Sequence, residues 1–242
     1  MSKYIVFLAL FINSYTYAGK IWLGFVIEEK QQSLFITRVI PNSPADKGGL
    51  RPQDEILEVG QKTTKSLDQF FKELKTKSSK DIISISIKRK NKTLTQKITP
   101  INSPSELEKL NIMFKKEIFP NVKLTPILNS ESEINLHEIK NKKIIMFWAT
   151  WCTYCHAALK RISEFSKEQK KSFLFISDES LSQLKKHLLK HKFNTDQFYQ
   201  IKDNSDFYLV NALPTLFKIN KEKVVEEISI GFGSSFNRLI SE

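Results

Sequence analysis

The sequence of 242 residues contains only two cysteines, Cys152 and Cys155, with two residues between them. This scarcity excludes a disulfide-stapled scaffold, which needs several cysteine pairs. It also argues against a structural zinc site, because zinc takes about four ligands and the chain has no second cysteine pair. A redox pair, a haem attachment point and two inert thiols remain as interpretations of the two cysteines.

Glycine and proline are also scarce, with 7 and 8 residues, whereas 40% of the residues are hydrophobic. This composition suits two ordinary globular domains and not a disordered chain. The net charge is +12 at pH 7 and comes from scattered lysines. A solvated basic surface accounts for this charge, so we expect no nucleic-acid partner.

No apolar run reaches the roughly 20 residues that a membrane-spanning helix needs. The first residues combine Lys3, the apolar run Tyr4–Ile12 and the small residues Thr16 and Ala18, which is typical of a secretory signal peptide over residues 1–18. An uncleaved N-terminal anchor is the alternative. Export would place the protein in the periplasm, an oxidising compartment where a lone cysteine pair can form a disulfide.

The N-terminal half has the pattern of a small β-barrel closed by two helices. Strands are predicted at Leu34–Ile40, Ile82–Lys88 and Leu94–Ile98, the last two as a hairpin. One short helix is predicted where Ser43 precedes Pro44. A second follows Ser66, which forms a predicted capping box with Gln69.

The stretches IWLGF and ITRVIPNSPADKGGLRPQDEILEVG, followed by a capped helix and a hairpin, resemble a bacterial PDZ domain over residues 19–100. The resemblance implies a loop whose backbone N–H groups bind the C-terminal carboxylate of a protein, beside a strand that pairs with the peptide. The implied peptide-binding residues are Trp22, Leu23, Gly24, Phe25 and Ile27. The family's usual Gly-Asp after the first helix is Gln53-Asp54 here, which bears on the conformation of that turn.

Residues 101–118 mix serine, proline and charge around a short helical pattern, and we interpret them as a linker. The continuous apolar run Lys143–Trp148 then predicts a central strand buried on both faces. A helix is predicted to begin at or near Cys152. A further strand, a helix, a hairpin and a short helix are predicted at 172–177, 180–191, 215–230 and after Gly231.

This position of the cysteines favours redox chemistry, because a helix N-terminus stabilises a thiolate. Cys152 would be the attacking sulfur and Cys155 the resolving one. C-x-x-C-H, which ends at His156, is also the attachment signature of c-type haem, but a strand before it and a helix beginning on it fit a redox centre better. His187 and His191 have no evident third ligand, so we interpret them as surface residues and expect no metal or other cofactor.

The string FWATWC, two residues and a second cysteine, preceded by NLHEIKNKK, resembles the thioredoxin-like domain of exported TlpA/ResA-type thiol-disulfide oxidoreductases over residues 119–242. The resemblance implies an α/β fold in which Pro214 is a cis-proline facing the active-site disulfide. It also implies that Trp151 shields one side of the sulfurs. The residues implied to meet the substrate are Leu213, Thr153 and Tyr154.

Two features depart from the thioredoxin pattern. The buried aspartate that accepts a proton from the second cysteine is replaced by Met146, so another group must move this proton. The dipeptide Thr153-Tyr154 between the cysteines differs from the common ones, and this dipeptide tunes redox potential. The direction of electron flow is therefore open.

These features predict an exported bacterial thiol-disulfide oxidoreductase of two domains, serving tasks such as cytochrome c maturation. Its expected partners are protein thiols and disulfides, a membrane redox protein and a protein C-terminus bound at the PDZ domain. The alternative is a non-catalytic assembly protein of the cell envelope, in which the PDZ domain carries the function and the thioredoxin-like domain is a scaffold.

Overall fold

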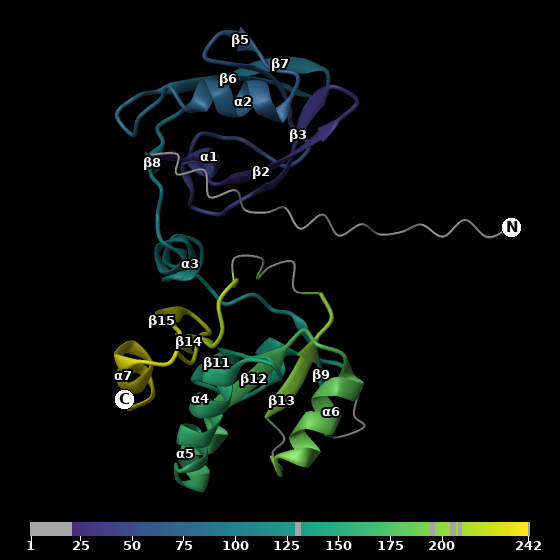
Figure 1. Cartoon of the computed structure of the whole chain (residues 1–242), viewed down its shortest axis with the longest axis vertical. Helices are drawn as coiled ribbons and strands as arrows, with labels where there is room; N and C mark the ends of the chain where they lie inside the picture. Colours follow the sequence, from purple (N-terminus) through teal and green to yellow (C-terminus); the bar gives the residue numbers. More distant parts are fainter. Residues whose placement is uncertain (1–20, 129–131, 194–196, 204–206, 208–209, 242) are drawn as a thin grey trace, which may run out of the picture. The chain divides into compact units, whose positions relative to one another are not determined.

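The computed structural model describes residues 21–128, 132–193, 197–203, 207 and 210–241, and the chain divides into two compact units after Pro104 (Figure 1). The predicted signal peptide at residues 1–18 lies outside the described residues. Within the described part of the chain, every helix is too short or too polar to cross a membrane.

The first unit contains a six-stranded antiparallel sheet in the order β2-β3-β4-β6-β7, with β5 paired to β4. Its strands are β2 (Phe25–Lys30), β3 (Ser33–Val39), β4 (Glu55–Val59), β5 (Lys62–Thr63), β6 (Ile83–Arg89) and β7 (Lys92–Ile98). A separate pair joins β1 (Ile21–Trp22) to β8 (Ile101–Asn102). The helices are α1 (Pro44–Lys47) and α2 (Leu67–Leu74).

The predicted start signals of both helices are present in the structure. Ser43 caps α1 by accepting a hydrogen bond from Asp46 N–H, and Ser66 caps α2 in the same way. The capping box of α2 is incomplete, because the Gln69 side chain accepts from the backbone N–H of Lys65 and not from that of Ser66. Local side-chain chemistry therefore sets where both helices begin.

The turn after α1 holds a glutamine where the PDZ pattern has a glycine. Gln53 adopts a left-handed backbone with φ of 73°. The next residue, Asp54, is fully buried and forms a two-pronged ion pair with Arg89, at 2.6 Å to Nε and 2.7 Å to Nη2. Backbone hydrogen bonds to Ile36 on both sides of the turn hold it in place. The surrounding contacts thus impose a glycine-like conformation on a glutamine.

We expect Gln53→Gly to stabilise the first unit by roughly 0.5–1 kcal/mol, since glycine avoids the left-handed penalty but loses more backbone entropy on folding. Gln53→Val should destabilise it, because a β-branched residue disfavours positive φ most strongly. Denaturant unfolding of the full chain measures both effects. Equal stability of the two variants would contradict this account of the turn.

The second unit contains a seven-stranded mixed sheet in the order β10-β9-β13-β12-β11-β14-β15. The strands are β9 (Lys123–Pro126), β10 (Ile134–Asn135), β11 (Ile144–Phe147), β12 (Phe173–Ser177), β13 (Phe198–Ile201), β14 (Thr215–Ile219) and β15 (Val225–Ile230). The helices are α3 (Glu106–Phe114), α4 (Thr153–Ser163), α5 (Lys167–Lys171), α6 (Leu181–Lys190) and α7 (Ser234–Ser241), with a 3₁₀ turn at Leu136–Glu138. Strands β11, β12 and β13 are parallel.

Successive residues of β11 face opposite cores. Ile144 and Met146 pack in a cluster with side chains from α4, α6 and α7. Phe147 faces the other side, where its ring lies 4.8 Å from Phe207 and 5.8 Å from Phe217. The predicted central strand, buried on both faces, is thus observed. Helices α4, α6 and α7 pack on one of these faces (Figure 1).

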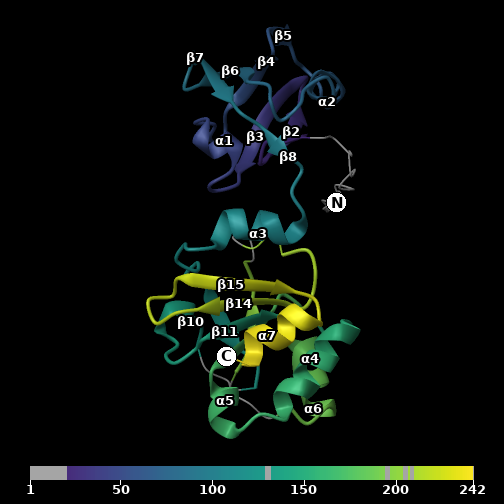
Figure 2. The ribbon, with the colours of Figure 1, turned by 90° about the vertical axis from the view of Figure 1, so that its left-hand side faces the viewer.

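Helix α3 covers the other side of the sheet and lies within the segment that we interpreted as a linker. Figure 2 shows α3 running along the β14–β15 hairpin. Ser105 and Glu108 form a complete capping box, and Leu110 and Phe114 are buried. The Phe114 ring stacks on Phe207 at 5.8 Å. Residues from Ser105 onward therefore belong to the second unit, because its aromatic core needs this helix.

Candidate functional site

The two cysteines lie at the start of α4, directly after the central strand β11 (Figure 1). Cys152 is the N-cap residue, and a disulfide joins it to Cys155 in the first turn. The Sγ atom of Cys152 also accepts a hydrogen bond of 3.1 Å from the backbone N–H of Cys155. The free N–H groups of a helix N-terminus favour negative charge, so this position stabilises a thiolate on Cys152 after reduction.

The disulfide is embedded in an apolar core. Cys155 is 0% exposed and Cys152 is 5% exposed. Both sulfurs pack in one hydrophobic cluster with Met146, Trp148 and Ala158. The buried carboxylate of the thioredoxin pattern is therefore replaced by the thioether of Met146, as the sequence indicates, and this thioether cannot accept the proton of a thiol at neutral pH.

Exposed side chains surround the buried sulfurs. The side chain of Trp151 is 72% exposed and that of Tyr154 is 65% exposed, and Thr153 between the cysteines is also exposed. Large aromatic groups in water next to a reactive sulfur offer contact area for a polypeptide. Their contact with a substrate, and the shielding of the sulfurs by Trp151, stay predictions.

The expected cis peptide bond is present between Leu213 and Pro214. Strand β14 begins at the next residue, Thr215, which pairs with Phe147 at the end of β11. This pairing brings Pro214 to the end of the sheet at which α4 begins. Leu213 packs against the cluster that contains both cysteines, and the carbonyl of Pro214 accepts a hydrogen bond of 2.8 Å from Gly231 N–H. The structure thus brings these two predicted residues together with the disulfide.

A carboxylate that the sequence analysis missed holds the loop between β11 and the cysteines. Glu179 accepts hydrogen bonds of 2.6 Å from both the backbone N–H and the hydroxyl of Thr150. Its own carbonyl accepts a hydrogen bond of 2.9 Å from the Gln200 side chain on β13. Glu179 follows β12, which is parallel to β11, and the ends of neighbouring parallel strands meet at one edge of a sheet. The position of Glu179 just after a predicted strand was the sequence signal that could have identified it.

We expect Thr150→Val to lower the free energy of unfolding of the second unit by about 1.5 kcal/mol, because it removes a hydrogen bond to a charged group and leaves part of the Glu179 carboxylate unpaired. Thr150→Ser keeps the hydroxyl and should cost under about 0.5 kcal/mol. Chemical denaturation of the oxidised protein compares the two variants. No loss in Thr150→Val, or a larger loss in Thr150→Ser than in Thr150→Val, would contradict a stabilising role of the hydroxyl.

Three imidazoles meet beside the cysteines. His187 is half-buried among them, which differs from its interpretation as a surface residue, whereas His191 is exposed as expected. The ring of His156 on α4 lies 4.9 Å from that of His187 and 5.8 Å from that of His191, and the last two are 4.4 Å apart. We call these three residues the imidazole cluster. Among the described residues, no three histidine, cysteine, aspartate or glutamate side chains are placed to hold a metal ion.

The predicted peptide-binding loop of the first unit is built around a glycine. Gly24 has φ of 83°, and its carbonyl accepts hydrogen bonds from Ile40 N–H at 2.9 Å and from the Ser43 hydroxyl at 3.1 Å. A Cβ atom on this glycine would lie 2.3 Å from Ser43 Cβ. The carbonyl of the buried Leu23 accepts from Ala45 N–H at 2.8 Å. Only glycine fits this close approach.

Strand β2 and helix α2 border the place where a peptide would lie. β2 is an edge strand of its sheet, and among the described residues no strand pairs with its outer side. Phe25 and Ile27 of β2 are partly buried against the core, and the Phe25 ring lies 5.9 Å from Phe70 of α2. Trp22 is not in the loop itself, because it pairs with β8, but its ring approaches Gly24.

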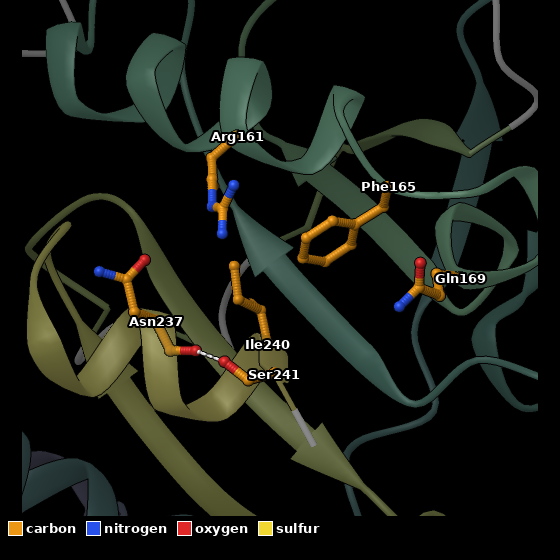
Figure 3. Close-up of a pocket in the computed structure, with 6 residues that line it drawn as sticks. All are labelled: Arg161, Phe165, Gln169, Asn237, Ile240 and Ser241. Carbon is orange, nitrogen blue, oxygen red and sulfur yellow. Dashed lines mark hydrogen bonds between the residues drawn. The ribbon is translucent and has the colours of Figure 1, made fainter.

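A separate pocket of about 310 Å³ lies between the end of α4, α5 and α7 (Figure 3). It is lined by Arg161, Phe165, Gln169, Asn237, Ile240 and Ser241. The Arg161 side chain reaches between the helices in Figure 3 and is paired with Glu164 at 2.7 Å. Because Arg161 is nine residues beyond Cys152 on the same helix, roughly 13 Å along its axis, this pocket is not part of the disulfide site.

Comparison with known protein families matches both units. Residues 22–99 match the PDZ domain family and residues 116–228 match the AhpC/TSA family. The chain therefore combines a PDZ domain with a thioredoxin-like domain, and the predicted fold class of two domains is confirmed. The AhpC/TSA match supports activity of the thiol oxidoreductase type.

The similarity to individual proteins is low or covers only part of the chain. A 70-residue segment is 34% identical to the mitochondrial serine protease HTRA2 of Bos taurus. The matched segment makes up 29% of this chain but only 15% of that protein. The HtrA3 PDZ domain bound to a phage-derived ligand, FGRWV, is 20% identical over 34% of this chain and 85% of its own, with a TM-score of 0.31. A Chlorobium tepidum protein is provisionally assigned as a thiol:disulfide interchange protein DsbE. It is 19% identical over 52% of this chain and 95% of its own length, with a TM-score of 0.42.

Proposed function

We propose that this protein is an exported thiol-disulfide oxidoreductase that works through the Cys152–Cys155 pair and uses its PDZ domain to hold a substrate or partner. The observation that supports it most is the disulfide itself, which lies at a helix N-terminus after a central strand in a domain that matches the AhpC/TSA family. Pro214 at the same end of the sheet adds the surface on which an extended substrate segment would lie.

In the reducing direction, the Cys152 thiolate attacks one sulfur of a substrate disulfide. A mixed disulfide forms, and the other substrate sulfur leaves as a thiolate that takes a proton from water. Cys155 then loses its proton and attacks Cys152, which closes the protein disulfide and releases the second substrate thiol. Two electrons pass from protein to substrate. In the oxidising direction the same steps run backwards.

The PDZ domain would raise the effective concentration of its ligand at the redox site by tethering a protein C-terminus. The loop at Gly24 offers backbone N–H groups to a carboxylate, and the free edge of β2 offers hydrogen bonds to an added strand. The PDZ match over residues 22–99 supports this assignment of roles.

We propose that the protein is periplasmic, because residues 1–18 have the composition of a signal peptide. The alternative is that these residues stay uncleaved and anchor the protein to the membrane. A membrane protein would then exchange electrons with the Cys152–Cys155 pair, and maturation of cytochromes c is one process that consumes such electrons. Protein thiols and disulfides are the substrates of either direction.

The proposal is tested by trapping. Cys155→Ser should accumulate a mixed disulfide between Cys152 and its substrate, because the resolving sulfur is missing, whereas Cys152→Ser should accumulate none. Non-reducing electrophoresis after acid quenching detects the adducts. Equal trapping by both variants would contradict the assignment, and an unmodified protein that forms no disulfide in any thiol buffer would favour the non-catalytic assembly protein.

A redox titration of the same protein sets the direction. A midpoint near about −270 mV, as in thioredoxin, identifies a reductant, and one near about −120 mV, as in DsbA, identifies a disulfide donor.

The peptide role has its own test. We expect a labelled FGRWV peptide with a free C-terminus to bind the full chain at least about 10-fold more tightly than the same peptide with an amidated C-terminus, because amidation removes the charge that the loop would hold. Gly24→Ala should abolish the difference, since its Cβ would collide with Ser43. Gly233→Ala, where a Cβ meets nothing within 4 Å, is the matched control. Fluorescence anisotropy measures binding, and equal affinity of the two peptides would contradict a carboxylate-binding loop.

A further inference from the structure

The resolving step requires a group that takes the proton of Cys155. This thiol is 0% exposed, so bulk water does not reach it directly. The position of the usual buried carboxylate is held by Met146, which has no proton-accepting group at neutral pH. A protein base near the first turn of α4 is therefore needed to ionise the thiol, whose unperturbed pKa is about 8.5 and which burial disfavours further as a thiolate.

The imidazole cluster lies next to this turn. His156 directly follows Cys155, and its backbone N–H donates a hydrogen bond of 3.2 Å to the carbonyl of Cys152. The ring of Trp148, which packs in the same cluster as both cysteines, lies 5.8 Å from the ring of His187. His156 thus adjoins Cys155 in the chain, and His187 contacts Trp148, which packs with both cysteines.

Two buried ring nitrogens of the imidazole cluster are unsatisfied. The Nε2 atoms of His156 and His187 are buried and have no hydrogen-bond partner among the described residues. The stacked rings of His156 and His187 are inclined by only 27°, at a separation where two imidazolium charges would repel each other. His191 is exposed and connects the cluster to solvent.

Burial is the largest influence on the pKa of His187. Burial and the neighbouring rings of His191 and His156 lower the pKa of His187 below its ordinary value, and Lys190 on the same helix acts in the same direction. The Glu179 carboxylate opposes them and favours the protonated form. The net effect favours the neutral form of His187, which a proton acceptor needs, and Glu179 is the carboxylate that favours the charge it would gain.

We propose that the imidazole cluster, entered through His156, accepts the proton that Cys155 loses in the resolving step. The S–H bond of Cys155 breaks, its electron pair attacks Cys152, and the substrate sulfur leaves as a thiolate. The proton passes to an imidazole nitrogen and from there to water. The electrons come from the protein dithiol, so no further reactant is needed. This inference rests on the proposed function and names the base that its mechanism lacks.

The test separates the two chemical steps in one stopped-flow trace of the reduced full chain. Dithiobis(nitrobenzoic acid) releases one yellow thiolate when Cys152 attacks it and a second when Cys155 resolves the adduct. We expect His156→Gln to slow the second release by roughly 10²-fold at about pH 7, the scale of a positioned general base, with the first release changed less than about 2-fold. The difference should shrink as the pH rises, because a higher pH favours ionisation of the thiol without a base.

Two further variants exclude a structural effect. His187→Gln should slow the second release and shift its pH profile, whereas Lys186→Gln, an exposed neighbour on α6, should change neither. Added imidazole should restore the second release in His156→Ala. An unchanged second release in both histidine variants, or equal slowing of both releases, would overturn the proposal. So would an effect of a metal chelator on the unmodified protein. Absence of the first release would instead refute the proposed function.

Discussion

The junction between strand β11 and helix α4 is the constraint on which the chemistry of the second unit depends. The strand is buried on both faces, so its end has a fixed position, and Glu179 anchors the short loop that follows. The helix can then begin only at Cys152. Its first turn places the sulfur of Cys152 at the helix N-terminus and that of Cys155 one turn further in, and both pack in the same apolar cluster. The two sulfurs thus differ in their position on the helix although only two residues separate them.

The site has two regions, an apolar core that disfavours charge and a polar border that can hold it. The apolar core around Cys155 contributes packing energy but penalises any charge on that sulfur. The polar groups that can carry charge are at its border, in the Thr150–Glu179 pair and in the imidazole cluster. A disulfide, which is uncharged, fits the core, whereas the dithiol form depends on the border groups. Stability and reactivity are therefore supplied by different residues.

Local signals in the sequence predicted the elements nearest the chemistry. Ser43, Ser66 and the apolar run of β11 each specify their element within a few residues, and the cis-proline followed from the family resemblance. The sequence analysis missed β13 and treated the helical pattern of α3 as part of a linker, because both elements are fixed by distant partners. Glu179 and the imidazole cluster were missed for the same reason, since they meet across elements that only the folded sheet brings together.

Helix α3 changes where the second domain begins, with a consequence for any fragment made from this chain. Phe114 contributes a ring to the aromatic group formed with Phe207 and Phe217 on the side of the sheet opposite α4. A fragment that starts at residue 119 would lack this ring and leave a face of phenylalanines open to water. Such a face promotes self-association. Aggregation of that fragment would then reflect a misplaced boundary and not an unstable thioredoxin-like fold.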